Sequence, residues 1–477
     1  MRLRAMPPIS AIVTLGIIVA GFVFSLAANL PGHFSYDSVM QLWEGRTGSY
    51  NNWHPPVMAW LLGVFDALSP GASLFVIFNG LLGFGSFAAI LWLRPRPSWA
   101  AAAVAACAVL TPQLLIYEGA VWKDVLFADA GVAGFACLAL AAAFWLKLRL
   151  RFGLIAAGLA LLVLAALARQ NGILMLIAGA AALGWIAAKQ APQRRAIAVM
   201  RYGGGALLGA LVMMMLANYA LAARVDRDTA DRQIVRLQAY DIIGALAAEP
   251  SYPLHEIESA DPHLVEMLRS DGVRLYNPER SDTLLNSPAL QSALLNTRLS
   301  LFSAQWRDLV LHHLWLYLRV RADVFRWVFL TPDLRLCVPY YVGVDGPPDE
   351  MAQLGLKQRW DDRDQALDDY AGNFVGTPIL SHAFYAALAI AALFFLLWRR
   401  RPEDIAIAAM LGGALVCTIS YFVISIACDY RYLYALDLSA MLAMFYLSLD
   451  RFGFLPPPNI KGGGFLHRPQ IEEDISA

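Results

Sequence analysis

The polar residues best suited to chemistry lie in a short segment that follows the first apolar stretch of the chain. Asp37, Gln41 and Glu44 are spaced so that a helix would place them on one face. The other face would consist of Tyr36, Met40 and Trp43. A carboxylate held in this way can accept a proton from a reacting hydroxyl group. The alternative is a solvated polar face with no chemical role.

Further polar residues recur at the ends of other apolar stretches. His54-Pro55-Pro56 begins the next helix, since proline is tolerated in a first helical turn. The prolines are explained by architecture, which leaves His54 as a candidate pocket residue. Segment 117–124 carries Glu118, Lys123 and Asp124 beside a long apolar run, where charges are costly to retain. A helix-end ion pair and a functional site both explain these three charges.

The composition indicates which elements must hold these residues. Hydrophobic residues make up 58% of the 477 residues and charged residues 16%, whereas soluble domains are about 25% charged. Apolar runs of roughly 20 residues recur, the length that crosses a hydrocarbon core of ~30 Å. We therefore expect an all-α polytopic membrane protein with about ten transmembrane helices. The predicted spans are 9–30, 72–93, 98–116, 125–146, 152–168, 173–188, 203–222, 377–398, 404–427 and 432–450.

The distribution of basic residues orients these spans. Loops rich in Lys and Arg alternate with loops that are poor in them. The positive-inside rule places the rich loops, and with them both termini, in the cytoplasm. Loops 31–56, 117–124 and 169–172 then face the outside.

Lys123, Arg169 and Arg431 are isolated basic residues on this outer side, each in a short loop. Such placement opposes the topological preference, so three cases on one face indicate that cations are needed there. A bound phosphate would need them, because Arg offers a bidentate donor fork and Lys a point charge.

The remaining sequence divides into further units. We expect a transmembrane catalytic module in 1–222, a mainly helical outer domain inserted in 223–376, and C-terminal transmembrane helices in 377–450. Residues 451–477 are polar and proline-rich, which predicts a disordered cytoplasmic tail. Two of the five cysteines, Cys337 and Cys428, could both face the outside, and whether they form a disulfide is left open.

The order of these motifs resembles the GT-C superfamily of integral-membrane glycosyltransferases, in particular the family-39-like bacterial transferases that use polyprenyl-phosphate sugars. The resemblance extends over roughly 1–220 and 377–450. The stretches that carry it are Tyr36-Asp37, His54-Pro55-Pro56, Trp122-Lys123-Asp124, Arg169-Gln170-Asn171-Gly172 and Arg431-Tyr432-Leu433.

The resemblance implies transfer of a sugar from a lipid phosphate carrier to an acceptor on the outer face, with Asp37 as catalytic base. Many members have two adjacent acidic residues where this chain has Asp37-Ser38, a departure that puts a paired-acid metal site in doubt. The acceptor could be a glycan, a lipid or a protein.

Each candidate residue has an expected role. Lys123, Arg169 and Arg431 would stabilise the leaving phosphate, and direct displacement would invert the anomeric configuration. Asp124 would orient Lys123 or bind the acceptor. The pocket would further include Tyr36, Glu44, His54, Glu118 and Tyr432.

Alternative interpretations remain at this level. Asp37, Glu118 and Asp124 could bind a divalent cation such as Mg²⁺ or Mn²⁺, although nothing in the sequence requires one. A transporter or lipid flippase would also have many spans, but would place its charges at mid-membrane, where they are nearly absent here. A structural subunit would explain the inserted domain but not the converging charges. Membrane lipids are expected partners, and no feature indicates nucleic acid.

Overall fold

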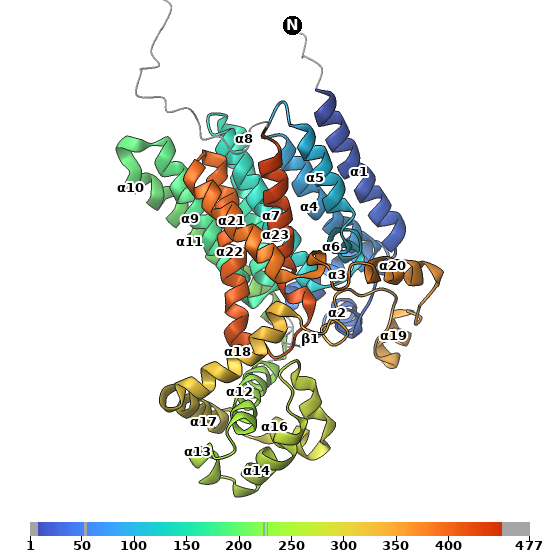
Figure 1. Ribbon diagram of the computed structural model, residues 1–477, viewed down its shortest axis with the longest axis vertical. Coiled ribbons are helices and arrows are strands. Elements are labelled where there is room, and N and C mark those ends of the chain that lie inside the picture. The colour runs from blue at the N-terminus through green and yellow to red at the C-terminus, as the bar shows by residue number, and fades with distance from the viewer. Residues whose placement is uncertain (1–7, 52–54, 223–224, 227, 451–477) are drawn as a thin grey trace, which may run out of the picture.

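The computed structural model describes residues 8–51, 55–222, 225–226 and 228–450 (Figure 1). Within these residues the chain is almost entirely helical. The two named strands are β1 (Tyr50–Asn51) and β2 (Val225–Asp226), which pair in parallel. The predicted pocket residue His54 and the predicted tail 451–477 lie outside the described residues.

Every predicted span contains a helix in the described structure, which confirms the all-α polytopic class. Eight helices are long and apolar enough to cross a membrane, and a bent pair gives a ninth candidate. These helices comprise α1 (Ile9–Asn29), α4 (Ser73–Leu91), α7 (Lys123–Ala143), α8 (Leu148–Ala168), α9 (Ile173–Gln190), α11 (Gly205–Ala222), α21 (His382–Arg399) and α22 (Pro402–Ile424).

Two predicted spans differ in detail from a simple helix. The bent pair is α5 (Trp99–Val109) with α6 (Pro112–Leu115), and the chain turns by 72° between them. Pro112 explains the break, because it lacks an N–H group and disfavours helical geometry at the preceding Thr111, which is extended. The last span, α23 (Tyr434–Ser448), has only 15 residues.

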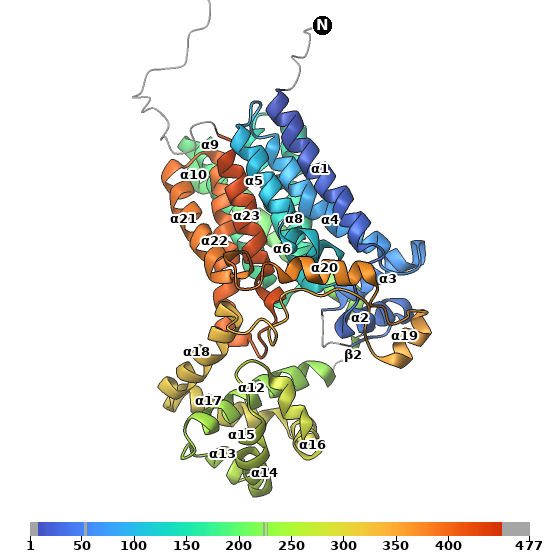
Figure 2. The same cartoon turned by 45° about the vertical axis from the view of Figure 1, so that its right-hand side comes forward.

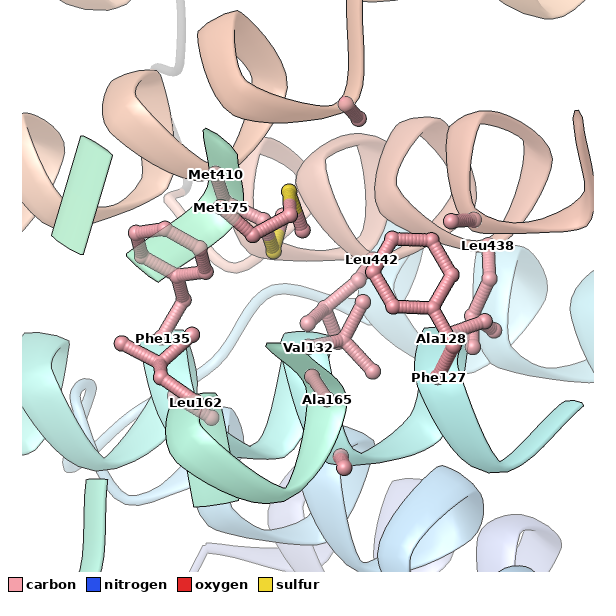
Figure 3. Close-up of a cluster of buried hydrophobic side chains, with 14 of the residues drawn as sticks. Phe127, Ala128, Val132, Phe135, Leu162, Ala165, Met175, Met410, Leu438 and Leu442 are labelled. Carbon is pink, nitrogen blue, oxygen red and sulfur yellow. The ribbon is translucent and has the colours of Figure 1, made fainter. Parts of the chain in front are cut away.

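The bundle is centred on α7, where all but three of the 21 residues are buried inside the protein. Its small residues allow close approach of neighbouring helices. A Cβ atom at Gly134 would lie 3.0 Å from the carbonyl oxygen of Gly158 on α8. Figure 3 shows the core around Val132 of α7, where it meets side chains of α8, α9, α22 and α23.

Two shorter helices, α2 (Tyr36–Thr47) and α3 (Pro56–Leu68), follow α1 and pack against each other. Gly45 and Gly63 permit this contact, since a Cβ atom at either would overlap the other helix. Arg46 donates two hydrogen bonds of 2.8 and 2.7 Å to Asp66 across the pair. These contacts fix the orientation of α2, on which Asp37 lies.

The inserted region contains a separate helical unit that projects from one end of the bundle (Figures 1 and 2). This unit has its own hydrophobic core, in which Arg321 pairs with Asp241 at 2.5 Å although both are fully buried. Its helices are α12 (Asp228–Ala248), α13 (His255–Glu258), α14 (Pro262–Met267), α15 (Val273–Leu275), α16 (Pro288–Asn296), α17 (Leu299–His312) and α18 (Leu314–Leu330).

The rest of the insertion returns to the first loop. Helix α19 (Pro348–Leu354) packs against α2. Helix α20 (Asp362–Gly372) lies beside the connection between α1 and α2, where Arg363 donates a 2.5 Å hydrogen bond to the Leu30 carbonyl. Phe34 and Val344 form a parallel bridge, and Val344 forms a second bridge with Arg359. The insertion therefore contributes both a projecting unit and a wall against α2.

Short helical turns connect these elements. They are η1 (Tyr117–Gly119), η2 (Gln170–Gly172), η3 (Pro192–Arg194), α10 (Arg195–Ala198), η4 (Val199–Gly204), η5 (Leu268–Gly272), η6 (Ser281–Asn286), η7 (Pro378–Leu380) and η8 (Tyr430–Leu433). Of these, η4 and η5 are π-helical and the other η turns are 3₁₀.

The start of α1 and the end of α23 lie at the same end of the bundle. Ser10 Oγ donates to the Pro97 carbonyl at 2.8 Å, and the neighbouring Ser98 N–H donates to Leu449 at 3.0 Å. Arg94, from a predicted cytoplasmic loop, pairs there with Asp450 at 2.6 Å. The projecting α12–α18 unit lies at the opposite end (Figure 1). The basic loops are thus grouped as predicted, and their assignment to the cytoplasm stays a prediction.

Candidate functional site

A cavity of about 380 Å³ lies where the bundle meets the projecting unit. Five of its lining side chains are basic and three are acidic. Four of the expected site residues and Asp37 itself contribute to it. Its charged and aromatic lining consists of Asp37, Lys123, Arg169, Arg236, Arg280, Asp282, Asp429, Arg431 and Tyr432. We call this space the basic cavity.

Arg431, in η8, is the centre of the charge network. Its Nη2 lies 2.7 Å from Asp37 Oδ2 and 3.0 Å from Asp429 Oδ2, and its Nε lies 3.6 Å from Asp124 Oδ2. The guanidinium also lies over the Trp122 ring at 4.9 Å. Burial opposes its charge, but Asp429 and Asp37 outweigh burial and raise the pKa of Arg431 above its ordinary value. Arg431 is therefore a permanent cation held by three carboxylates.

Asp124 belongs to the same charge network as Arg431. It is 1% exposed at the start of α7, where it forms an ion pair with Arg169 as well as approaching Arg431. Arg169 lies between the end of α8 and η2, and its guanidinium is over the rings of Tyr432 at 4.9 Å and Tyr421 at 5.3 Å. The Asp124 carboxylate is thus an anchor for two arginines and is hidden from solvent.

The projecting unit supplies cavity residues that the sequence did not reveal. Arg236 donates a 3.1 Å hydrogen bond to Ser281 and pairs with Asp282. Arg280 reaches the cavity because it forms an antiparallel bridge with Ala427, just before the Asp429–Arg431 turn. No local pattern distinguishes these arginines from others in the insertion, so only the folded contact between segments could identify them.

Cys337 and Cys428 form a disulfide, which settles the pairing that the sequence left open. Their Cα atoms are 5.0 Å apart, and 91 residues separate them in the chain. Cys428 directly precedes Asp429, and its N–H donates to the Glu279 carbonyl at 2.8 Å. The turn that carries Arg431 is therefore attached covalently to the insertion.

Three expected pocket residues lie elsewhere. Tyr36 is 63% exposed and does not line the basic cavity. Glu44 turns toward the buried side of α2, where burial raises its pKa to about 7 although the Asn51 N–H at 3.4 Å favours the carboxylate. Glu118 is buried and accepts a long 3.5 Å hydrogen bond from Tyr434, close to Asp129.

Asp37, Asp124 and Glu118, the residues considered as metal ligands, do not form one cluster. Asp37 and Asp124 are bound to arginines, and Glu118 lies in the separate buried group with Asp129. In the part of the chain that the structure describes, no three His, Cys, Asp or Glu side chains are arranged to hold a metal ion.

Two further carboxylates are buried in the bundle, each within two turns of the N-terminus of its helix. Asp129 on α7 is fully buried, and Asp437 on α23 is buried with His382, whose Nδ1 lies 2.9 Å from Asp437 Oδ1. Tyr430, the neighbour of Arg431, donates a 2.8 Å hydrogen bond to the same Asp437. The residues that flank Asp129 and Asp437 are mostly apolar on all faces of the helix. Helical periodicity therefore could not show that these two side chains point into the bundle.

Comparisons with known proteins give a distant likeness. No protein-family model and no curated protein match the chain. Among solved structures, it is similar to the apo oligosaccharyltransferase of Archaeoglobus fulgidus, with a TM-score of 0.32 and 14% identity. The alignment covers 91% of this chain and 50% of that chain, so this chain spans about half the length of its neighbour. Fold and cavity together define an all-α polytopic membrane protein with a charged cavity at one end of its bundle.

Proposed function

We propose that this protein is an integral-membrane glycosyltransferase that moves a sugar from a polyprenyl-phosphate carrier to an acceptor hydroxyl or amine. The reaction takes place in the basic cavity, on the outer face of a bacterial inner membrane, with both termini cytoplasmic. The observation that supports it is the gathering of Asp37 with three cations from separate loops, Lys123, Arg169 and Arg431, at one end of a membrane bundle.

The basic cavity suits an anionic leaving group. Basic side chains outnumber acidic ones among its lining residues, and Arg431 and Arg169 are fixed in place by carboxylates and aromatic rings. Donors that are already oriented stabilise developing charge at little cost of reorganisation. A polyprenyl phosphate leaves as an anion, so it needs such cations more than it needs a proton.

Asp37 is the proposed base because it is the most accessible of the carboxylates that contact Arg431. Its side chain is 32% exposed, whereas that of Asp124 is 1% exposed. Its partner Arg431 also binds Asp429 and approaches Asp124, so Arg431 stays compensated when Asp37 moves away. A bound phosphate would replace the Asp37 carboxylate on Arg431, which frees Asp37 to face the acceptor.

The proposed reaction is a direct displacement. The acceptor oxygen or nitrogen forms a bond to the anomeric carbon as the bond from that carbon to the phosphate oxygen breaks. The acceptor proton passes to Asp37, and the phosphate leaves with the bonding electrons. Arg431, Arg169 and Lys123 stabilise its negative charge. Attack opposite the leaving group inverts the anomeric configuration.

The test uses purified full-length protein in lipid nanodiscs with a polyprenyl-phosphate sugar as donor and a glycan, lipid or protein preparation as acceptor. We expect release of polyprenyl phosphate that depends on the protein. Lys123→Ala and Arg431→Ala should raise the donor KM, and Arg96→Ala, at the other end of the bundle, is the control. Wild-type donor affinity in both cavity variants would refute the phosphate site.

A second candidate function rests on the buried carboxylates. Glu118 and Asp129 lie together inside the bundle, and intramembrane ionisable residues mark ion pathways in many transporters. A lipid flippase with this pathway would move a labelled polyprenyl-phosphate lipid between leaflets of proteoliposomes without breaking its sugar–phosphate bond. Donor cleavage favours the transferase, and movement of intact lipid favours the flippase.

A further inference from the structure

A second cavity, of about 520 Å³, lies against the first loop and has a different chemical character from the basic cavity. Its volume is within the roughly 300–1,000 Å³ typical of small-molecule sites. Three aromatic residues line it together with two aspartates, an amide and one arginine. The side chains concerned are Tyr340, Tyr341, Asp345, Gln358, Arg359, Trp360 and Asp368. We call this space the aromatic cavity.

The wall of the aromatic cavity is held by backbone hydrogen bonds. Val344 and Arg359 exchange two of them, at 2.9 and 3.0 Å, and the Phe34 N–H donates to Gly343 at 3.0 Å. Gly343 has a φ of +83°, a conformation that favours glycine. The Trp360 ring is oriented by a 3.0 Å hydrogen bond to Gln365. The site is therefore formed before any ligand arrives.

Its charge excludes a phosphate ligand. Asp345 and Asp368 are acidic, and the one lining arginine, Arg359, is already engaged by Asp364 at 2.9 Å. An anion would meet two carboxylates and no available guanidinium. Aromatic faces beside carboxylate and amide groups suit a ligand with apolar C–H surfaces and many hydroxyl groups, which is the chemistry of a saccharide.

The buried ring of Trp122 lies between the two cavities. Trp122 lies 6.1 Å from Tyr341 of the aromatic cavity, measured between ring centroids, and 4.9 Å from the Arg431 guanidinium of the basic cavity. Its Nε1 donates a 2.9 Å hydrogen bond to Ser35, the residue before α2. The N–H of Asp345 in turn donates to Phe34 at 2.9 Å. The wall of the aromatic cavity is therefore bonded to the segment that directly precedes Asp37.

We propose that the aromatic cavity binds a saccharide unit of the acceptor and presents it to Asp37 across Trp122. This inference rests on the proposed transferase function and names the acceptor class as a glycan, neutral or carrying amino sugars. The basic cavity then takes the anionic donor and the aromatic cavity takes the uncharged or cationic acceptor. The two substrates are separated by charge.

The experiment measures binding of a panel of neutral and amino-sugar oligosaccharides to the full-length protein in nanodiscs, without donor. We expect at least one to bind, with affinity reduced roughly tenfold or more by Trp360→Ala, since a stacking surface is lost. Trp398→Ala is the matched control, because Trp398 on α21 is also 57% exposed but lies at the far end of the bundle. Asp345→Asn should also weaken binding while keeping the shape of the site.

Two results would overturn the inference. One is that no oligosaccharide binds. The other is that binding occurs and neither Trp360→Ala nor Asp345→Asn reduces it. Donor cleavage is measured separately in the same preparations. A protein that binds oligosaccharide but never releases polyprenyl phosphate refutes the transferase, whereas one that cleaves donor but binds no oligosaccharide refutes only the glycan acceptor.

Discussion

Asp37→Asn should separate catalysis from stability, and the geometry around Arg431 gives the magnitude. The Asp37 side chain is 32% exposed, and Arg431 keeps Asp429 at 3.0 Å and Asp124 at 3.6 Å when Asp37 loses its charge. Partly exposed ion pairs contribute about 0–1 kcal/mol. The amide is also close in size to the carboxylate. We therefore expect the free energy of unfolding of Asp37→Asn to lie within about 1 kcal/mol of the wild-type value.

The same substitution should greatly reduce turnover. An amide cannot accept the acceptor proton, and a positioned general base contributes roughly 10²–10⁴-fold. The assay combines thermal unfolding of the purified protein with release of polyprenyl phosphate in nanodiscs. Turnover of Asp37→Asn within about threefold of the wild type would contradict the role of Asp37 as base.

Two neighbouring carboxylates provide controls. Asp429 binds the same guanidinium and its side chain is 23% exposed, so Asp429→Asn reproduces the loss of charge without removing the base. We expect it to retain most of the turnover. Asp124→Asn removes a charge that is 1% exposed and bridges two arginines, and breaking a buried pair costs about 3–5 kcal/mol. Equal loss of turnover in Asp429→Asn and Asp37→Asn would show that Asp37 acts only on Arg431.

Three further predictions concern stability. Cys337→Ser removes a cross-link between residues 91 apart, which should destabilise the protein by about 2–4 kcal/mol and lower the transfer rate, as measured by thermal unfolding and turnover with and without reductant. Glu44 has its pKa raised by burial to about 7, so stability should fall as pH rises from the ordinary carboxyl pKa toward 7 and then level off; Glu44→Gln should flatten that part of a pH series of melting temperatures. Arg321→Met leaves the buried Asp241 uncompensated and should cost about 3–5 kcal/mol, whereas the double variant with Asp241→Leu should recover much of that loss in the same melts.

The class of the protein follows from the sequence because it depends on local quantities. Hydrophobic length predicted a helix in each of the ten spans, and the alternation of basic loops predicted which helix ends lie together. The short loops around Lys123, Arg169 and Arg431 were also informative, since a charge beside an apolar run can only emerge at the membrane surface. The sequence therefore grouped them at one end of the bundle, and the packing of the helices brought them to one cavity.

The pairing of charges was decided by tertiary structure alone. Helical spacing placed Gln41 and Glu44 on the face of Asp37, but the Gly45–Gly63 contact with α3 turns both toward the buried side of α2. Asp124 pairs with Arg169 and Arg431 because α7, α8 and η8 meet there. No local sequence pattern predicts that these three elements are neighbours. Arg280 of the projecting unit reaches the basic cavity through its bridge with Ala427. The aromatic cavity is lined within residues 340–368, and a hydrogen bond from Phe34 to Gly343 holds it against the first loop. Periodicity and hydropathy specify the end of the bundle at which a residue lies. Only the packing of the helices specifies which other residue it contacts.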